Sequence, residues 1–226
     1  MMKYFPLLFS LFWLAVTSLS AQTMISFQDA EKYDEKRYAD IKGSAYLFED
    51  FIDGYITGAD GVLYDKVSIN YNGFEEAFEI KQGDQFITLD EQYYSEIKVV
   101  KPGQQDTMTF IRGVHPIFKG RFIELIYRSE NATVVRRHYV GLSETTVNNI
   151  GRKEEFKRFL KKREIRLVTG TGAKDIKTLK LNKKKLLQTL GHKKELEAHI
   201  KDQKIDISSN EGLAALIQKW DELEHP

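Results

Sequence analysis

Short apolar stretches that alternate with polar residues and end in tight turns fill residues 43–139, and this pattern most limits the folds open to the chain. Apolar and polar side chains alternate over residues 67–71, Asn72-Gly73 follows, and alternation resumes over residues 78–80. Asn-Gly favours a two-residue type I′ hairpin turn, because both residues tolerate positive φ. Such strands, recurring at about ten-residue spacing, predict an antiparallel sheet with one face on a core.

We therefore expect a mainly β protein of about eight to ten strands, arranged as an antiparallel meander or a partly closed, barrel-like sheet. A short three-helix tail makes it α+β overall. The expected organisation is a signal peptide at 1–21, a charged N-terminal arm or short helix at 22–42, a β-rich domain at 43–180, and a helical segment at 181–226 that packs on or beside the sheet.

The tail changes to helical periodicity after residue 181. Asn182 is a good N-cap for a first helix, and Gly191 ends it. A second helix follows, and Ser208 with Glu211 fits a capping box at the start of a third. Helices this short need packing partners, so we expect their apolar stripes to lie against each other or the sheet.

Residues 152–168 (RKEEFKRFLKKREIRLV) allow two structures. The spacing of Phe156, Phe159 and Leu160 suits an amphipathic helix. Alternation on both sides of Lys162-Arg163 suits a basic hairpin that turns at this dipeptide.

The N-terminus has the composition of a secretory leader. Lys3 precedes an apolar run over residues 4–16, and small polar residues then lead to a cleavage site after Ser20 or Ala21. The run is shorter than the roughly 20 residues that span a membrane, so an uncleaved anchor is the lesser alternative. We expect export to a periplasm or the cell exterior, with no transmembrane span in the mature chain.

Cysteine is absent, which excludes disulfides, thiol catalysis and cysteine-ligated zinc. The net charge of +1 conceals an asymmetry. Residues 22–112 carry 9 Lys/Arg and 18 Asp/Glu, a net charge of −9, whereas residues 150–226 carry 19 and 12, a net charge of +7. The two parts could attract each other within one molecule, the basic part could meet an anionic partner, or both could be solvated faces.

The sequence predicts no catalytic, cofactor-binding or metal-ligating residue. His192 and His199 are seven residues apart and lack the i, i+4 spacing and third ligand of a helical zinc site. The stretch 170–174 (GTGAK) lacks the spacing of a phosphate-binding loop. Glu75, Glu76 and Glu79 could pair for glycoside chemistry only if two carboxyls faced each other across a cleft.

The densest basic patch comes from five lysines of the tail, and it is the candidate partner-binding site. It fits an acidic protein or a peripheral contact with anionic lipid, while export argues against nucleic acid. The lysines are Lys183, Lys184, Lys185, Lys193 and Lys194.

The chain resembles a group of uncharacterised secreted bacterial proteins. The shared features are the stretches 43–51 (GSAYLFEDF), 60–64 (DGVLY) and 76–80 (EAFEI), with a lysine-rich end such as 181–187 (LNKKKLL) and 193–200 (KKELEAHI). The resemblance implies export, the sheet and the tail, favours the hairpin over residues 152–168, and carries no activity or catalytic residue.

Three functions follow as expectations. The first is a non-enzymatic binding or interaction module of the periplasm or cell envelope, whose partner is a protein or an apolar ligand held by a curved aromatic sheet. The second is a hydrolase that acts on an envelope or extracellular polymer through acidic residues of the sheet. The third is a structural or assembly component held by its basic tail.

Overall fold

The computed structural model describes residues 32–33, 36–83, 85–100, 107–149, 152–170 and 172–225. The predicted signal peptide, residues 1–21, lies outside the described residues, as does much of the predicted N-terminal arm or helix over 22–42. In the described part of that segment, residues 36–40 form turns and Ile41–Lys42 is a short strand, so no helix is present there.

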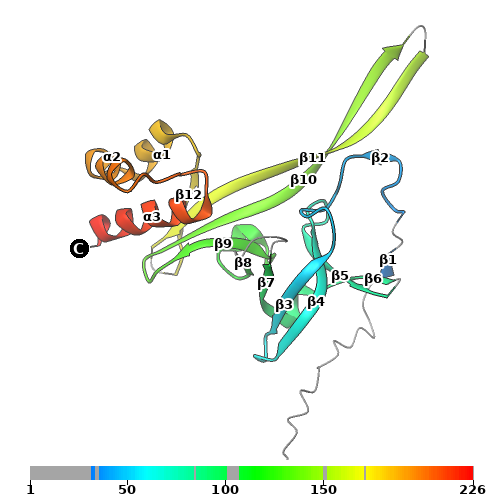
Figure 1. Ribbon diagram of the computed structural model, residues 1–226, viewed down its shortest axis with the longest axis horizontal. Helices are drawn as coiled ribbons and strands as arrows, with labels where there is room; N and C mark the ends of the chain where they lie inside the picture. Colours follow the sequence, from blue (N-terminus) through cyan, green and yellow to red (C-terminus); the bar gives the residue numbers. More distant parts are fainter. Residues whose placement is uncertain are drawn as a thin grey trace, which may run out of the picture.

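Twelve strands form one sheet, with the order β1-β6-β5-β4-β3-β7-β8-β9-β10-β11-β12 and β2 beside β11 (Figure 1). All neighbours are antiparallel except β2 and β11, which are parallel. The strands are β1 Lys32–Tyr33, β2 Ile41–Lys42, β3 Ile52–Gly58, β4 Leu63–Asn72, β5 Ala77–Gln82, β6 Gln85–Thr88, β7 Tyr94–Val100, β8 Thr107–Ile111, β9 Ile123–Arg128, β10 Ala132–Asn149, β11 Arg152–Thr169 and β12 Asp175–Leu179. The 3₁₀ turns are η1 Glu91–Tyr93 and η2 Pro116–Phe118, and the helices are α1 Lys183–Leu190, α2 Lys193–Asp202 and α3 Asn210–Glu224.

The predicted fold class is confirmed, since the chain is mainly β with one sheet that does not close and three helices near the C-terminus. The strand order departs from a simple meander at three places, since β1 pairs with β6, β2 with β11 and β3 with β7. Because β3 pairs with both β4 and β7, the chain crosses from β6 through η1 to a β7 that lies beside β3. Two runs of sequential strands, β3 to β6 and β7 to β12, therefore spread from one central pair.

An aromatic core curls the sheet around itself. The ring of Phe78 on β5 lies 4.9 Å from that of Phe110 on β8, although β4, β3 and β7 separate these strands in the sheet. Tyr71 packs against both rings and Phe122 packs against Phe78, and all four side chains are at most 1% exposed. The concave side is thus filled by side chains rather than open to a ligand.

The three helices bury the opposite end of the sheet (Figure 1). Leucines and isoleucines of the helices form one core with Val134, Ile165 and Leu167 of β10 and β11. Trp220 belongs to this core and connects α3 to the end of α1, because its indole N–H donates to the backbone oxygen of Leu190 at 2.8 Å. The sheet and the helical tail therefore share a core.

The ends predicted from the sequence are correct for α1, but the predicted start of α3 is displaced by one residue. Asn182 caps α1, and Gly191, at φ 78°, ends it, as predicted. The predicted Ser208–Glu211 capping box is wrong by one residue: Ser209 caps α3 by accepting from the Gly212 amide at 3.0 Å. Ser208 is engaged by Asp206, whose carboxylate it contacts through both its amide and its hydroxyl.

Residues 152–168 belong to a single strand. The ladder between β10 and β11 runs without interruption from Ala132↔Thr169 to Asn149↔Arg152. Lys162 and Arg163 lie in the middle of it, so the predicted turn at this dipeptide is wrong, although the preference for β over helix is correct. Alternation looks the same in one long strand and in two short ones, and only the partner strand distinguishes them.

The turn at Asn72-Gly73 also differs from the prediction. Asn72 ends β4 in register with Ala77, and the four residues between them form the loop. The Asn72 carboxamide oxygen accepts from two loop amides, and the positive φ falls on Glu76 at 56°. Gly73 lies against β10 instead: its carbonyl accepts from the Val140 amide at 2.7 Å.

We predict that Gly73→Ala destabilises the protein by about 1–3 kcal/mol, because the new Cβ would lie 2.8 Å from Val140 Cγ2. Gly141→Ala is the matched control, since its Cβ would meet only the end of the Lys162 side chain at 3.5 Å. Urea unfolding followed by Trp220 fluorescence measures both. Equal stability of the two variants would contradict the packing of the loop on β10.

Candidate functional site

The distal part of the β10–β11 hairpin projects beyond the rest of the sheet (Figure 1). Residues 139–149 and 152–162, which pair with each other, are called the arm from here on. Beyond Val140, no described strand pairs with the outer edge of β10. On β11, the strand β2 pairs only with Lys157 and Arg158, and the pairing with β12 starts at Ile165. The arm is therefore a two-stranded ribbon that is open along most of both edges.

The segment 36–48 connects the arm to the curled sheet. Its strand β2 pairs with β11, and Tyr46 bridges to Asn72 at the end of β4. The amide of Leu47 donates to the Tyr71 carbonyl at 2.9 Å. This short stretch of chain thus contacts both the arm, through β11, and the curled sheet, through β4.

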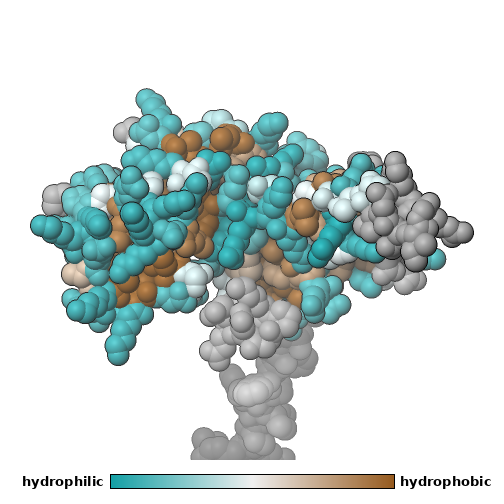
Figure 2. All heavy atoms as spheres, turned by 90° about the horizontal axis from the view of Figure 1, so that it is seen from above, coloured by the Kyte–Doolittle hydropathy of each residue, from teal (hydrophilic) through white to brown (hydrophobic). Residues whose placement is uncertain are grey.

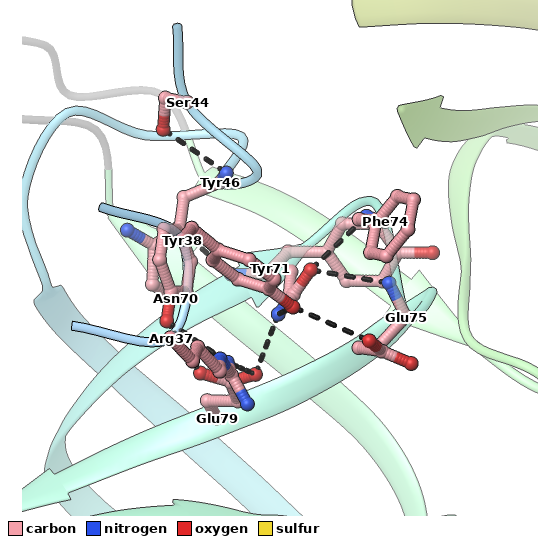
Figure 3. Close-up of polar contacts among 10 residues, drawn as sticks. Arg37, Tyr38, Ser44, Tyr46, Asn70, Tyr71, Phe74, Glu75 and Glu79 are labelled. Atoms are coloured by element: carbon pink, nitrogen blue, oxygen red, sulfur yellow. Dashed lines mark hydrogen bonds and ion pairs between the residues drawn. The ribbon is translucent and has the colours of Figure 1, made fainter. Parts of the chain in front are cut away.

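A buried carboxylate holds this segment in place (Figure 3). Glu79 of β5 is 0% exposed and accepts from the Arg37 guanidinium, from the Tyr46 hydroxyl at 2.7 Å and from the Asn72 carboxamide at 2.7 Å. Burial lowers the pKa of Arg37, but the hydrogen bond and charge of Glu79 outweigh it and raise that pKa above its ordinary value. Burial, and then Glu79, raise the pKa of the Tyr46 hydroxyl, which therefore remains a donor.

The same cluster positions an aromatic contact at the base of the arm. Asn72 also donates to the Tyr38 hydroxyl at 3.1 Å, which fixes the Tyr38 ring. That ring meets Phe159 of β11 edge-on at 5.2 Å, and Phe74 meets Phe159 at the same distance. Phe159 is thereby buried at 5% exposure.

We predict that Glu79→Gln destabilises the protein by about 2–4 kcal/mol, because it removes the charge that compensates a largely buried guanidinium. Glu75→Gln is the control: that carboxylate is exposed and accepts only a 3.3 Å bond from Tyr38. Amide hydrogen exchange should show faster exchange at residues 41–47 in Glu79→Gln alone. Unchanged exchange there would contradict the anchoring role.

Two further carboxylates hold the base of the arm. Glu76 receives a bidentate contact from Arg137, at 2.7 and 2.6 Å, and a bond from Arg121 at 2.5 Å. Burial raises the pKa of Glu76, but the two arginines outweigh it and bring the pKa below its ordinary value. Its ion pairs connect the β4–β5 loop to β10.

Glu124 of β9 connects β10 to the helical tail. It is 0% exposed and contacts His138 Nε2 at 2.6 Å, Arg136 Nη1 at 3.2 Å and Asn210 Nδ2 at 2.7 Å. Burial raises the pKa of Glu124, yet these partners outweigh it and bring the pKa below its ordinary value. Asn210 is the first residue of α3, so this cluster fixes the helix against the sheet.

A fourth carboxylate, Glu91, is partly buried without such compensation. Burial raises the pKa of Glu91 to about 7, against the lowering effects of the Phe122 amide, Arg121 and Arg112. Its Oε1 atom and the hydroxyl of Tyr71 have no hydrogen-bond partner within the described part of the chain. The folded protein therefore binds a proton at Glu91 more tightly than the unfolded chain does.

We predict that the Glu91 contribution favours folding fully below pH 4.5 and is lost as the pH rises through about 7. Glu91→Gln removes this dependence and should be more stable than the wild type by about 3 kcal/mol at pH 8. Urea unfolding from pH 4 to 8 measures the difference, with the exposed Glu130→Gln as control. A difference between Glu91→Gln and wild type that does not vary with pH would contradict the prediction.

The outer surface of the arm is basic and partly apolar. Lys157, Arg158, Lys161 and Lys162 are all exposed, while Leu160 is 39% exposed opposite the bare backbone of Gly141. Glu144, one of the carboxylates of the arm, lies 3.8 Å from Lys157. Sequence reasoning missed this site, because residues 152–168 were considered for their secondary structure alone. The run of cations over residues 157–163 was the available signal.

The five lysines predicted from the sequence lie at the N-terminal ends of α1 and α2, three on the first helix and two on the second. All five are exposed, and none forms an ion pair with a described residue. Figure 2 shows hydrophilic residues along the rim of this helical half. The lysines lie at the other end of the molecule from the arm (Figure 1). Their role in partner binding stays a prediction.

The three glutamates considered for catalysis lie in different environments. Glu75 is exposed, Glu76 is ion-paired with two arginines, and Glu79 is fully buried on Arg37. Glu76 and Glu79 thus serve the base of the arm, while Glu75 faces solvent. No group of three or more His, Asp or Glu within the described ranges has an arrangement that could hold a metal ion.

Comparison with known proteins gives no further guidance: no family model, curated protein or solved structure matches the chain. Among the described helices, none has the length and apolar content needed to cross a bilayer.

Proposed function

We propose that this protein is an exported, non-enzymatic interaction module of the cell envelope and that it contacts a partner protein through the arm. The observation that carries the proposal is the projecting ribbon with open edges. Unpaired strand edges are the template for adding a strand from another chain, and natural proteins usually cover or shorten them.

The anchoring of the arm supports this proposal. Three carboxylates, Glu76, Glu79 and Glu124, fix its base to the sheet and the helices. A rigidly held ribbon loses little conformational freedom on binding, which favours affinity. The filled concave side of the sheet favours a protein partner over an apolar small ligand.

A photo-crosslinking residue at Leu160, in the full-length protein expressed in its source cell, tests the contact. We expect a discrete adduct that is absent when the same residue replaces Leu63, which is 58% exposed on β4 and outside the arm. The same adducts from both positions, or no adduct from either, would overturn the proposed contact.

Export rests on the leader and is tested separately. We expect the N-terminus of the protein purified from cells to begin at Ala21 or Gln22, in the periplasmic or extracellular fraction. An intact Met1 on protein in the cytoplasm would contradict export and leave the arm contact to be judged by crosslinking.

A further inference from the structure

The charge asymmetry of the chain has a definite placement in the fold. Cations gather on the arm, where Lys157, Arg158, Lys161 and Lys162 are exposed. Exposed carboxylates gather at the start of β3, at Glu49, Asp50 and Asp53. These two groups are of opposite sign and each lacks enough counter-charge of its own.

The two groups are not ion-paired inside one molecule. Among the described residues, no ion pair joins Glu49, Asp50 or Asp53 to a cation of the arm, although Lys161 donates to the Leu47 carbonyl at 3.3 Å. Arg158 and Lys162 lie on the face of β11 opposite to Phe159, which packs against Tyr38 of the segment 36–48. These two cations therefore point away from the segment that leads to Glu49, and they are available to a second molecule.

The acidic side also has a shape that suits the arm. Glu49 and Asp50 border an open depression of about 360 Å³ that Phe51 and Phe86 line with rings 5.3 Å apart. Lys81, the cation in this depression, lies over the Phe86 ring. The depression therefore has two aromatic rings in its wall, with Phe51 partly exposed and Phe86 6% exposed, and carboxylates at its edge.

The exposed face of the arm carries the complementary arrangement. Arg158, Leu160 and Lys162 alternate along β11, so their side chains point to the same face. Gly141 lies opposite Leu160 and leaves that leucine accessible. An apolar side chain between two cations thus matches aromatic rings beside two carboxylates.

We propose that the arm of one molecule docks in the depression bordered by Glu49 and Asp50 on a second copy of this chain. The inference rests on the proposed arm contact and names its partner. The two surfaces differ, so the contact is head-to-tail, and a pair of molecules retains one free arm and one free depression. Such contacts build open chains or, where the rotation closes, rings.

Sedimentation velocity of the mature protein, residues 22–226, tests self-association at about 20 mM and about 500 mM NaCl, where screening differs strongly. We expect oligomers that grow with concentration at low salt and dissociate at high salt. A monomer at low salt and about 100 µM would overturn the inference, since a contact weaker than this falls well below specific interfaces.

Charge reversal identifies the surfaces. Arg158→Glu with Lys162→Glu, and separately Glu49→Lys with Asp50→Lys, should each weaken association at least about tenfold. An equimolar mixture of the two variants should associate again, because each altered surface then meets its complement. The control, Lys177→Glu with Lys180→Glu, changes charge by the same amount at exposed lysines outside the arm and should associate like the wild type.

Loss of association in the lysine control, or failure of the mixture to associate, would overturn the assigned surfaces. These outcomes are distinguishable from failure of the proposed function. If the Leu160 crosslink captures a different protein while the purified chain stays monomeric, the arm contact stands and the second copy as its partner does not.

Discussion

The arrangement of the helices, the sheet and the arm depends on the ladder between β10 and β11. Its paired residues run from Ala132 beside the helical core to Asn149 in the arm. One end completes the sheet that the helices cover, and the other end extends past it (Figure 1). Backbone hydrogen bonds along this length make the ribbon continuous, so the position of the arm depends on how its middle is held.

Buried carboxylates hold that middle. Removing a carboxylate from water costs several kcal/mol unless charged or polar donors compensate it. Glu76, Glu79 and Glu124 each meet such donors, and these come from segments distant in sequence, such as Arg37, Arg137 and Asn210. A different arrangement of segments would leave the charges unpaired, so the clusters favour one arrangement over its competitors. Glu91 lacks this compensation, and binding a proton removes the charge whose burial is unfavourable.

The sequence predicted features that depend on neighbouring residues. Asn182 begins α1 and Gly191 ends it where expected, because a cap interacts with backbone groups only a few residues away. Predictions failed where a distant segment intervened. Gly73 serves the approach of β10 rather than a type I′ turn, and Lys162-Arg163 continues a strand because β10 pairs with it. The cap of α3 shifted to Ser209 because Asp206 engages Ser208.

By itself, the sequence determined the mainly β class, the three helices and their order, since alternation and capping are encoded locally. Only the tertiary structure decided which carboxylates are buried, that the sheet curls around Phe78 and Phe110, and that a basic ribbon projects from it. These features arise from contacts between residues far apart in the chain, and no local period records such contacts.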